Sequence, residues 1–241
     1  MRKLKNTALI ALMLCAVLAL TSCNMVGSLL GGMFTDYNIK LLVQGNLDET
    51  YLGKVNEAYL ELIESNEAES EEYYLECMEA DADYFAYYWG IIGENEAFDI
   101  LDEALRARIV DLCKRIYSHS KYTVESAEKQ SDGGYVVKVI VEPVDIMKKA
   151  DELYESGTYA PLEAFFDKSD KADWANMTEA QYIALCNEYG NIIVDMFETL
   201  MPDIGHEAAK SLLIQVNIEN DYWEINDDDF RRFDEYVVIY P

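Results

Sequence analysis

The chain has 241 residues and a formal net charge of −27, from 46 Asp and Glu against 19 Lys and Arg. So acidic a chain lacks the basic surface that neutralises phosphates, and we expect no nucleic-acid partner. Because 51% of the residues are hydrophobic, the chain is not a disordered acidic tail and can bury a sizeable core.

The first 23 residues have the pattern of an export signal. Three basic residues precede an apolar run, residues 7–20, which is shorter than the roughly 20 residues of a membrane-spanning helix. The run ends in Leu20-Thr21-Ser22-Cys23, which resembles a bacterial lipobox. The resemblance implies cleavage between Ser22 and Cys23 and a diacylglyceryl group on Cys23. A plain secretory signal or an uncleaved apolar anchor is the alternative.

This signal predicts where the chain resides. A diacylglyceryl group carries two acyl chains, which suffice for stable anchoring. We therefore expect lipid anchoring at the extracytoplasmic face of the cell membrane, with membrane contact through the lipid on Cys23. The predicted organisation is a cleaved signal peptide (1–22), a lipidated cysteine with a flexible tether (23–36) and an α+β domain (37–241), with two halves (37–157 and 158–241) as the alternative.

Helical periodicity dominates the first part of the mature chain. Apolar residues recur at helical spacing, and Asn66 followed by Glu69 resembles a capping box. Helices are predicted over residues 36–53, 54–64, 66–90 and 94–118.

The spacing of apolar residues then changes to every second residue, as in a strand, and this change occurs at two places in the chain. The first predicted hairpin turns at Ser131-Asp132-Gly133-Gly134. Thr178 and Gln181 form a capping box at the start of the helix that precedes the second hairpin. In order, the pattern predicts a strand that begins at 122–124, a returning strand at 135–142, a helix from Pro143 to Ser156 and a loop over 157–177. A helix from Thr178 to Pro202, strands at 212–218 and 222–225 around Asn220-Asp221, and a short helix after Asn226 follow. We predict an α+β fold, helix-rich, with two antiparallel hairpins packed against helices, which can join in one four-stranded sheet.

Beyond Cys23, three cysteines belong to the mature chain: Cys77, Cys113 and Cys186. Each falls on the apolar side of a predicted helix, and their spacing matches neither a disulfide framework nor a zinc site. Buried free thiols are predicted, with a Cys77–Cys113 disulfide as the alternative. We expect no metal site.

The sequence contains no recognisable catalytic constellation. His119 and His206 are predicted in a turn and a loop, there is no nucleophile elbow, and the 46 acids are too many to single out a pair. We therefore expect no enzyme, no catalytic residue and no cofactor.

Aromatic residues are concentrated between Tyr73 and Trp89. Such a cluster either packs in the core or lines a pocket, where tyrosines supply both apolar area and a hydroxyl. The candidate ligand-binding residues are Tyr84, Tyr88 and Trp89.

Several segments carry a family resemblance. Residues 84–88, 116–124 and 141–146 resemble an uncharacterised lipoprotein family of Gram-positive, clostridia-like bacteria with a domain of unknown function. The last hairpin, residues 222–225, is similar to cone-shaped α+β domains of the nuclear-transport-factor-2 or cystatin type. The resemblance implies an envelope location and adds little about mechanism. Because no catalytic constellation is present, we expect an envelope lipoprotein with a non-enzymatic binding or structural role, whose partner is an envelope protein or a small ligand. The alternative is a membrane-anchored hydrolase acting on cell-wall polymer through acidic residues.

Overall fold

A computed structural model describes residues 36–219 and 222–241. The described part combines helices with one four-stranded antiparallel sheet, which confirms the predicted α+β class and the joining of the two hairpins. The predicted signal peptide, Ser22, Cys23 and the tether lie outside the described residues, as does the predicted turn at Asn220-Asp221.

The helices and strands follow the predicted order. They are α2 (Asp36–Leu47), the π-helical turn η1 (Asp48–Leu52), α3 (Glu57–Leu62), α4 (Glu67–Tyr88), the short turn η2 (Phe98–Ile100), α5 (Glu103–Tyr117), β1 (Lys121–Lys129), β2 (Tyr135–Glu142), α6 (Ile146–Glu155), α7 (Ala160–Ser169), the short turn η3 (Trp174–Asn176), α8 (Glu179–Leu200), the short turn η4 (Met201–Asp203), β3 (Lys210–Glu219), β4 (Tyr222–Ile225) and α9 (Asp227–Val237).

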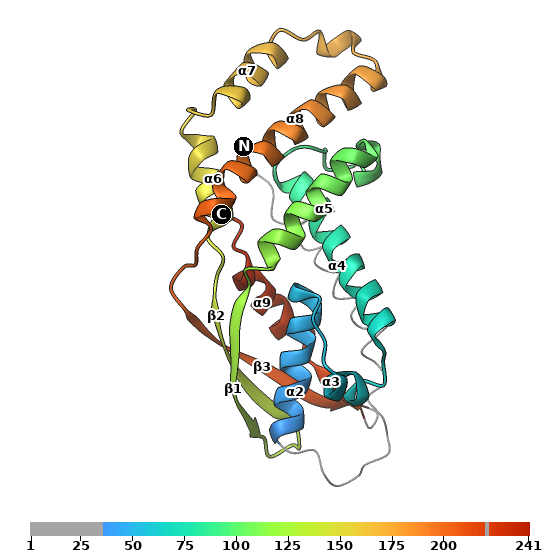
Figure 1. Cartoon of the computed structure of the whole chain (residues 1–241), viewed down its shortest axis with the longest axis vertical. Helices are drawn as coiled ribbons and strands as arrows, with labels where there is room; N and C mark the ends of the chain where they lie inside the picture. The colour runs from blue at the N-terminus through green and yellow to red at the C-terminus, as the bar shows by residue number, and fades with distance from the viewer. Residues whose placement is uncertain (1–35, 220–221) are drawn as a thin grey trace.

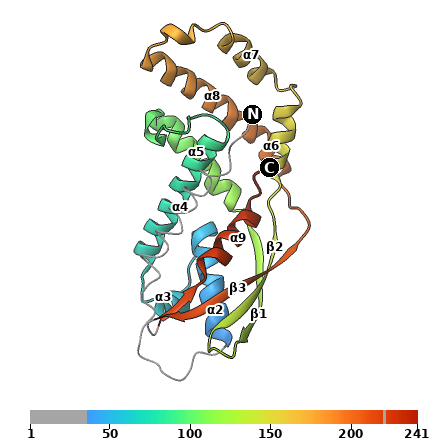
Figure 2. The same ribbon diagram turned by 180° about the vertical axis from the view of Figure 1, so that it is seen from behind.

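The sheet has the strand order β1-β2-β3-β4, and every neighbouring pair is antiparallel. On β2, Val137, Val139 and Val141 are fully buried and alternate with half-buried residues. Such alternation marks a sheet with one face against the core. Helices α2 and α9 cover that face, and both views of the ribbon show them beside the sheet (Figures 1 and 2).

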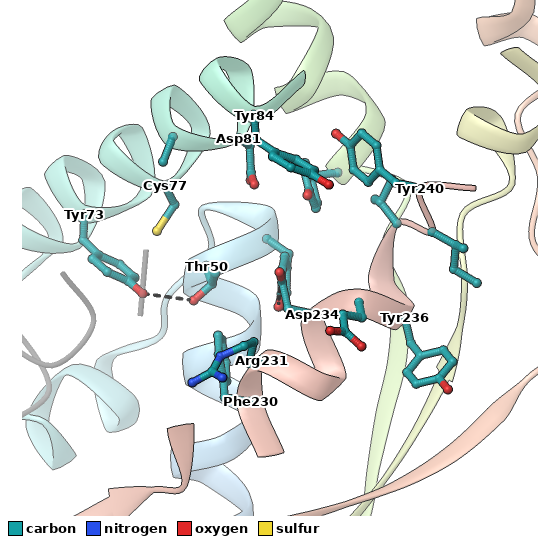
Figure 3. A pocket seen from close by; sticks show the side chains of 16 residues that line it. Thr50, Tyr73, Cys77, Asp81, Tyr84, Phe230, Arg231, Asp234, Tyr236 and Tyr240 are labelled. Carbon is teal, nitrogen blue, oxygen red and sulfur yellow. Dashed lines mark hydrogen bonds between the residues drawn. The ribbon is translucent and has the colours of Figure 1, made fainter. Parts of the chain in front are cut away.

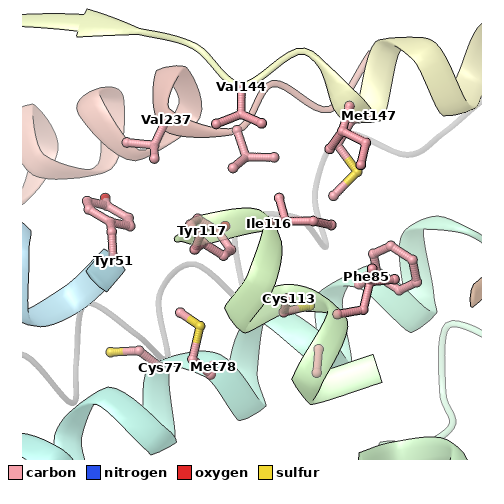
Figure 4. Close-up of a cluster of buried hydrophobic side chains, with 14 of the residues drawn as sticks. Tyr51, Cys77, Met78, Phe85, Cys113, Ile116, Tyr117, Val144, Met147 and Val237 are labelled. Carbon is pink, nitrogen blue, oxygen red and sulfur yellow. The ribbon is translucent and has the colours of Figure 1, made fainter. Parts of the chain in front are cut away.

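The remaining long helices extend from the sheet along the length of the molecule. Helix α4 packs on α5, α5 on α8, and α8 on α6 and α7, which lie at the far end from the sheet (Figure 1). The rings of Phe85 and Phe197 meet edge to face, with centroids 5.0 Å apart. Ile116, Val144 and Met147 are also fully buried and continue this cluster toward the sheet (Figure 4). Each such side chain stabilises the fold by about 1.5–3 kcal/mol.

Two predicted elements were wrong in extent. The helix predicted from residue 94 begins only at Glu103, because the Asp102 amide donates 2.8 Å to Asn187 Oδ1 on α8 and fixes the start. The predicted loop 157–177 contains the ten-residue helix α7. Its buried Leu162 and Phe165 pack on α8, so its stability comes from tertiary contact rather than from a strong local pattern.

The predicted N-terminal caps of the helices are only partly confirmed. Thr178 and Gln181 form the predicted capping box. Asn66 caps α4 by accepting from the Ala68 and Glu69 amides, but the Glu69 carboxylate accepts from Ser65 Oγ at 3.0 Å, so the predicted reciprocal bond is replaced.

Pro143 precedes α6 instead of opening it, and its carbonyl accepts from the Glu207 amide at 2.8 Å.

The three cysteines of the described chain, Cys77, Cys113 and Cys186, are buried and free. The predicted free thiols are confirmed, and the alternative Cys77–Cys113 disulfide is wrong. Within residues 36–219 and 222–241, no helix has the length and apolar character needed to cross a bilayer.

Candidate functional site

A cavity of about 380 Å³ lies where α4, η1, the end of α5, α9 and residues 238–240 meet (Figure 3). We call it the tyrosine cavity. Six of its sixteen lining residues are tyrosines: Tyr51, Tyr73, Tyr84, Tyr117, Tyr236 and Tyr240. Its volume falls within the range of about 300–1,000 Å³ that is typical of small-molecule sites.

Helical spacing explains how α4 builds one wall. Tyr73, Cys77, Asp81 and Tyr84 follow one another at intervals of four, four and three residues, so they share one face of the helix. Asp81 and Tyr84 project from that face on the side of α9 (Figure 3). The opposite wall belongs to α9, which contributes Asp234.

Asp81 and Asp234 place two carboxylates in this cavity. The Tyr51 hydroxyl donates to Asp234 Oδ1 at 2.9 Å, and the Tyr117 hydroxyl donates to Asp81. Among the ion pairs of the described residues, none includes Asp81 or Asp234. Since buried charges in proteins are normally paired, two carboxylates held only by hydroxyls are unusual.

Burial and mutual repulsion change how this pair titrates. Burial first, and then the negative charge of Asp234, raise the pKa of Asp81 well above its ordinary value. Burial raises the pKa of Asp234 to about 6, although the Tyr51 hydrogen bond opposes the rise. Both side chains keep some accessible surface because they line the cavity. Asp234 therefore changes its charge near pH 6, and Asp81 does so at a higher pH than an ordinary aspartate, as groups at functional sites often do.

The tyrosine hydroxyls around the pair remain protonated donors. Burial raises the pKa of Tyr51 and Tyr117 well above the ordinary value, and the neighbouring carboxylates raise it further. The pKa of Tyr240 is raised for the same first reason. The cavity thus combines aromatic rings, neutral hydroxyls and two acidic groups.

A second, more open hollow of about 420 Å³ adjoins the cavity, and we call it the aromatic hollow. Tyr84, Tyr88 and Trp89, the three residues singled out from the sequence, all line it. Tyr84 and Tyr240 line both spaces, and their rings meet edge to face at 5.0 Å. The Tyr88 hydroxyl donates to the Pro241 carbonyl at 2.6 Å.

Core packing and pocket lining coexist on α4. Trp89, just past its end, is only 6% exposed, and its ring meets Phe197 edge to face at 5.3 Å, so it belongs to the core as well as to the hollow. Its indole Nε1 is buried and has no hydrogen-bond partner in the described part of the chain. The two interpretations of the aromatic cluster, core packing and pocket lining, therefore both apply.

Sequence reasoning did not identify Asp81, Asp234, Tyr51 or Tyr117. Asp81 could have been found from the sequence, because its spacing places an acidic residue on the same helix face as Tyr73, Cys77 and Tyr84. No local pattern pointed to Asp234, which reaches the cavity from an element more than 150 positions later.

The two histidines lie together, away from the residues that line the tyrosine cavity. His206 Nε2 is 2.8 Å from the His119 carbonyl oxygen, which joins the segment before β1 to the segment before β3. Over the described ranges, no group of three or more His, Cys, Asp or Glu side chains is arranged to hold a metal ion.

Comparison with known proteins identifies a shared fold. No family model matches the chain, and no curated protein matches it in sequence. A crystal structure of the candidate lipoprotein ycdA from Bacillus subtilis aligns with a TM-score of 0.52 at 16% identity, over 83% of this chain and 56% of that one. This chain thus spans little more than half the length of that protein. At this identity the likeness shows the fold, and the nuclear-transport-factor-2 or cystatin likeness stays a prediction.

Proposed function

We propose that this chain is a lipid-anchored lipoprotein of the outer face of the cell membrane that binds a small molecule in the tyrosine cavity. The observation that carries the proposal is a cavity of about 380 Å³ whose wall combines aromatic rings, hydroxyls and two carboxylates. Mostly apolar walls with a few converging polar groups are typical of ligand sites. The role is binding rather than catalysis.

Two independent observations support the anchored location. The sequence around Leu20-Thr21-Ser22-Cys23 has the charge, length and small residues of a lipobox. The Bacillus subtilis protein that shares the fold is itself described as a candidate lipoprotein.

Anchoring is tested by metabolic labelling with a palmitate analogue in a Gram-positive host. We expect Cys23→Ala to abolish labelling and to leave an uncleaved precursor. Cys15→Ala is the matched control, because Met13 and Leu14 before Cys15 are too large for a lipobox. Undiminished labelling of Cys23→Ala would refute the anchor.

Ligand binding is tested by filling the cavity. Ala80 lines it, so Ala80→Trp places an indole inside, whereas Ala68→Trp adds the same side chain on the exposed side of α4. A panel of amines, amino acids, sugars, carboxylates and nucleosides is screened by the shift in Tm. A ligand of the cavity should raise the Tm of the wild type and Ala68→Trp and leave Ala80→Trp unchanged. Equal shifts in all three proteins would place binding elsewhere.

A hydrolase is the second candidate, and the titration of the carboxylate pair favours it. An aspartic acid whose pKa is raised to about 6 has the acidity of a general acid at neutral pH. The test is release of soluble fragments from purified cell wall at pH 6. We expect none from the binding protein. Release that Asp234→Asn and Asp81→Asn each abolish would make the hydrolase the better description.

A further inference from the structure

The charges that line the tyrosine cavity are out of balance. The lining contains three carboxylates, from Asp81, Asp234 and Glu235, and one guanidinium, from Arg231. Arg231 Nη2 is 3.1 Å from Asp228 Oδ1, so it already pairs with an exposed carboxylate. Acidic groups therefore outnumber basic ones in the lining, and no ion pair of the described residues includes Asp81 or Asp234.

The hydroxyls that touch the pair do not supply a positive charge. Tyr51 and Tyr117 each donate one hydrogen bond, which orients Asp234 and Asp81 respectively. A hydroxyl dipole stabilises a carboxylate much less than a cation does. The arrangement fixes both carboxyl groups in place, and a bound cation would favour their charged form.

The aromatic walls favour an organic cation over a metal ion. Tyrosine rings attract a cation through their faces, and this attraction grows when the cation is desolvated. Calcium, in contrast, takes six to eight oxygen ligands. The described part of the chain has no cluster of three acidic or histidine groups that would begin such a set.

Resting on the proposed small-molecule site, we propose that the ligand is a small organic cation, with a protonated amine or quaternary ammonium group between Asp81 and Asp234 and an apolar body against the tyrosine rings. Tyr84 and Tyr240, which lie edge to face between the tyrosine cavity and the aromatic hollow, are the rings best placed to receive that body.

The proposal is tested by calorimetric titration of the whole mature protein at pH 8 with defined probes. Benzylamine and benzyltrimethylammonium are the cations, benzyl alcohol is the neutral counterpart, and calcium chloride is the inorganic cation. We expect at least one organic cation to bind roughly tenfold or more tightly than benzyl alcohol. We expect calcium not to compete with that organic cation for the cavity.

Matched variants locate the binding. Asp81→Asn and Asp234→Asn keep size and hydrogen-bonding oxygen but remove the charge, so each should weaken cation binding by about tenfold or more and leave benzyl alcohol unaffected. Asp167→Asn makes the same charge change on the exposed side of α7 and should alter the affinity by less than about twofold. Circular dichroism confirms that each variant is folded.

The outcomes separate this inference from the function on which it rests. Benzyl alcohol binding as tightly as the cations, with both asparagine variants unaffected, would overturn the cation inference while leaving a small-molecule site intact. Binding of calcium alone, or of neither organic cation, would also overturn it. A neutral ligand from the thermal panel that Ala80→Trp excludes would then still support the cavity as a binding site.

Discussion

A hydrogen bond of 2.9 Å joins the Tyr51 hydroxyl to Asp234 Oδ1 across 183 positions of sequence. It links the π-helical turn η1 to α9 at the wall of the tyrosine cavity. The Tyr51 ring is stacked on Tyr117 at 5.8 Å and on Phe230 at 6.3 Å, so its hydroxyl is held in one position. Tyr51 therefore both fixes the geometry of Asp234 and limits the rise in its pKa.

Replacing Tyr51 by phenylalanine should raise the pKa of Asp234 above its value of about 6, because the hydrogen bond to the ionised carboxylate is lost. The unfolding free energy should fall by about 1–2 kcal/mol at pH 8, where Asp234 is charged, and by less at pH 5. Carboxyl-carbon NMR titration gives the pKa. Tyr37→Phe, at an exposed tyrosine of α2, should change neither quantity. An unchanged Asp234 titration would contradict the assigned hydrogen bond.

The raised pKa of Asp234 should also be visible in how the unfolding free energy depends on pH. The folded-state pKa of Asp234 lies above its unfolded value, so the native state binds more protons between about pH 4 and 6. Its contribution to stability is therefore present at low pH and is lost as pH rises through about 6. Asp234→Asn should be more stable than the wild type at pH 8, by about 1–3 kcal/mol, and similar to it at pH 4.

Urea unfolding of Asp234→Asn at a series of pH values measures this difference, with Asp167→Asn as the control. A destabilised Asp234→Asn at pH 8, with its fold intact, would show that the carboxylate is stabilised in the native state and that its pKa is not raised.

Gly190 allows α8 to approach its neighbours closely. A Cβ there would lie 2.7 Å from Leu105 Cδ2 on α5 and 2.8 Å from Ile91 Cγ2. Gly190→Ala should therefore destabilise the fold by about 1–3 kcal/mol, despite the better helix propensity of alanine. Adding Leu105→Val should recover part of the loss, measured as non-additivity in a double-mutant cycle. Simple additivity would mean that Leu105 does not oppose the new methyl group.

The capping box at the start of α8 offers a local test. The Gln181 amide donates to Thr178 Oγ1 at 3.3 Å, and the Thr178 amide donates to Gln181 Oε1 at 2.9 Å. Thr178→Ala should lower the unfolding free energy by about 1 kcal/mol, whereas Thr178→Ser keeps the hydroxyl and should cost much less. Equal losses for the two variants would point to the methyl group rather than the cap.

Features with a short-range cause were predictable from the sequence. The alternation of Val137, Val139 and Val141 defined β2 and its buried face, because side chains of a strand point to opposite sides. The Thr178 cap and the turn at Gly133, which adopts φ 99°, followed from residue chemistry within three or four positions. The lipobox pattern is likewise local, and it predicts location without reference to the fold.

Features that depend on distant segments were decided only by the tertiary structure. The start of α5 depends on Asn187, 85 positions away, and α7 is a helix because Leu162 and Phe165 find α8. The pairing of Asp81 with Asp234 is of the same kind. A periodic pattern specifies which face of a helix is buried, but the partner of that face is set by how the helices and the sheet pack together. The sequence therefore determined the class of fold and the predicted anchor, and packing decided where the cavity lies and which two carboxylates share it.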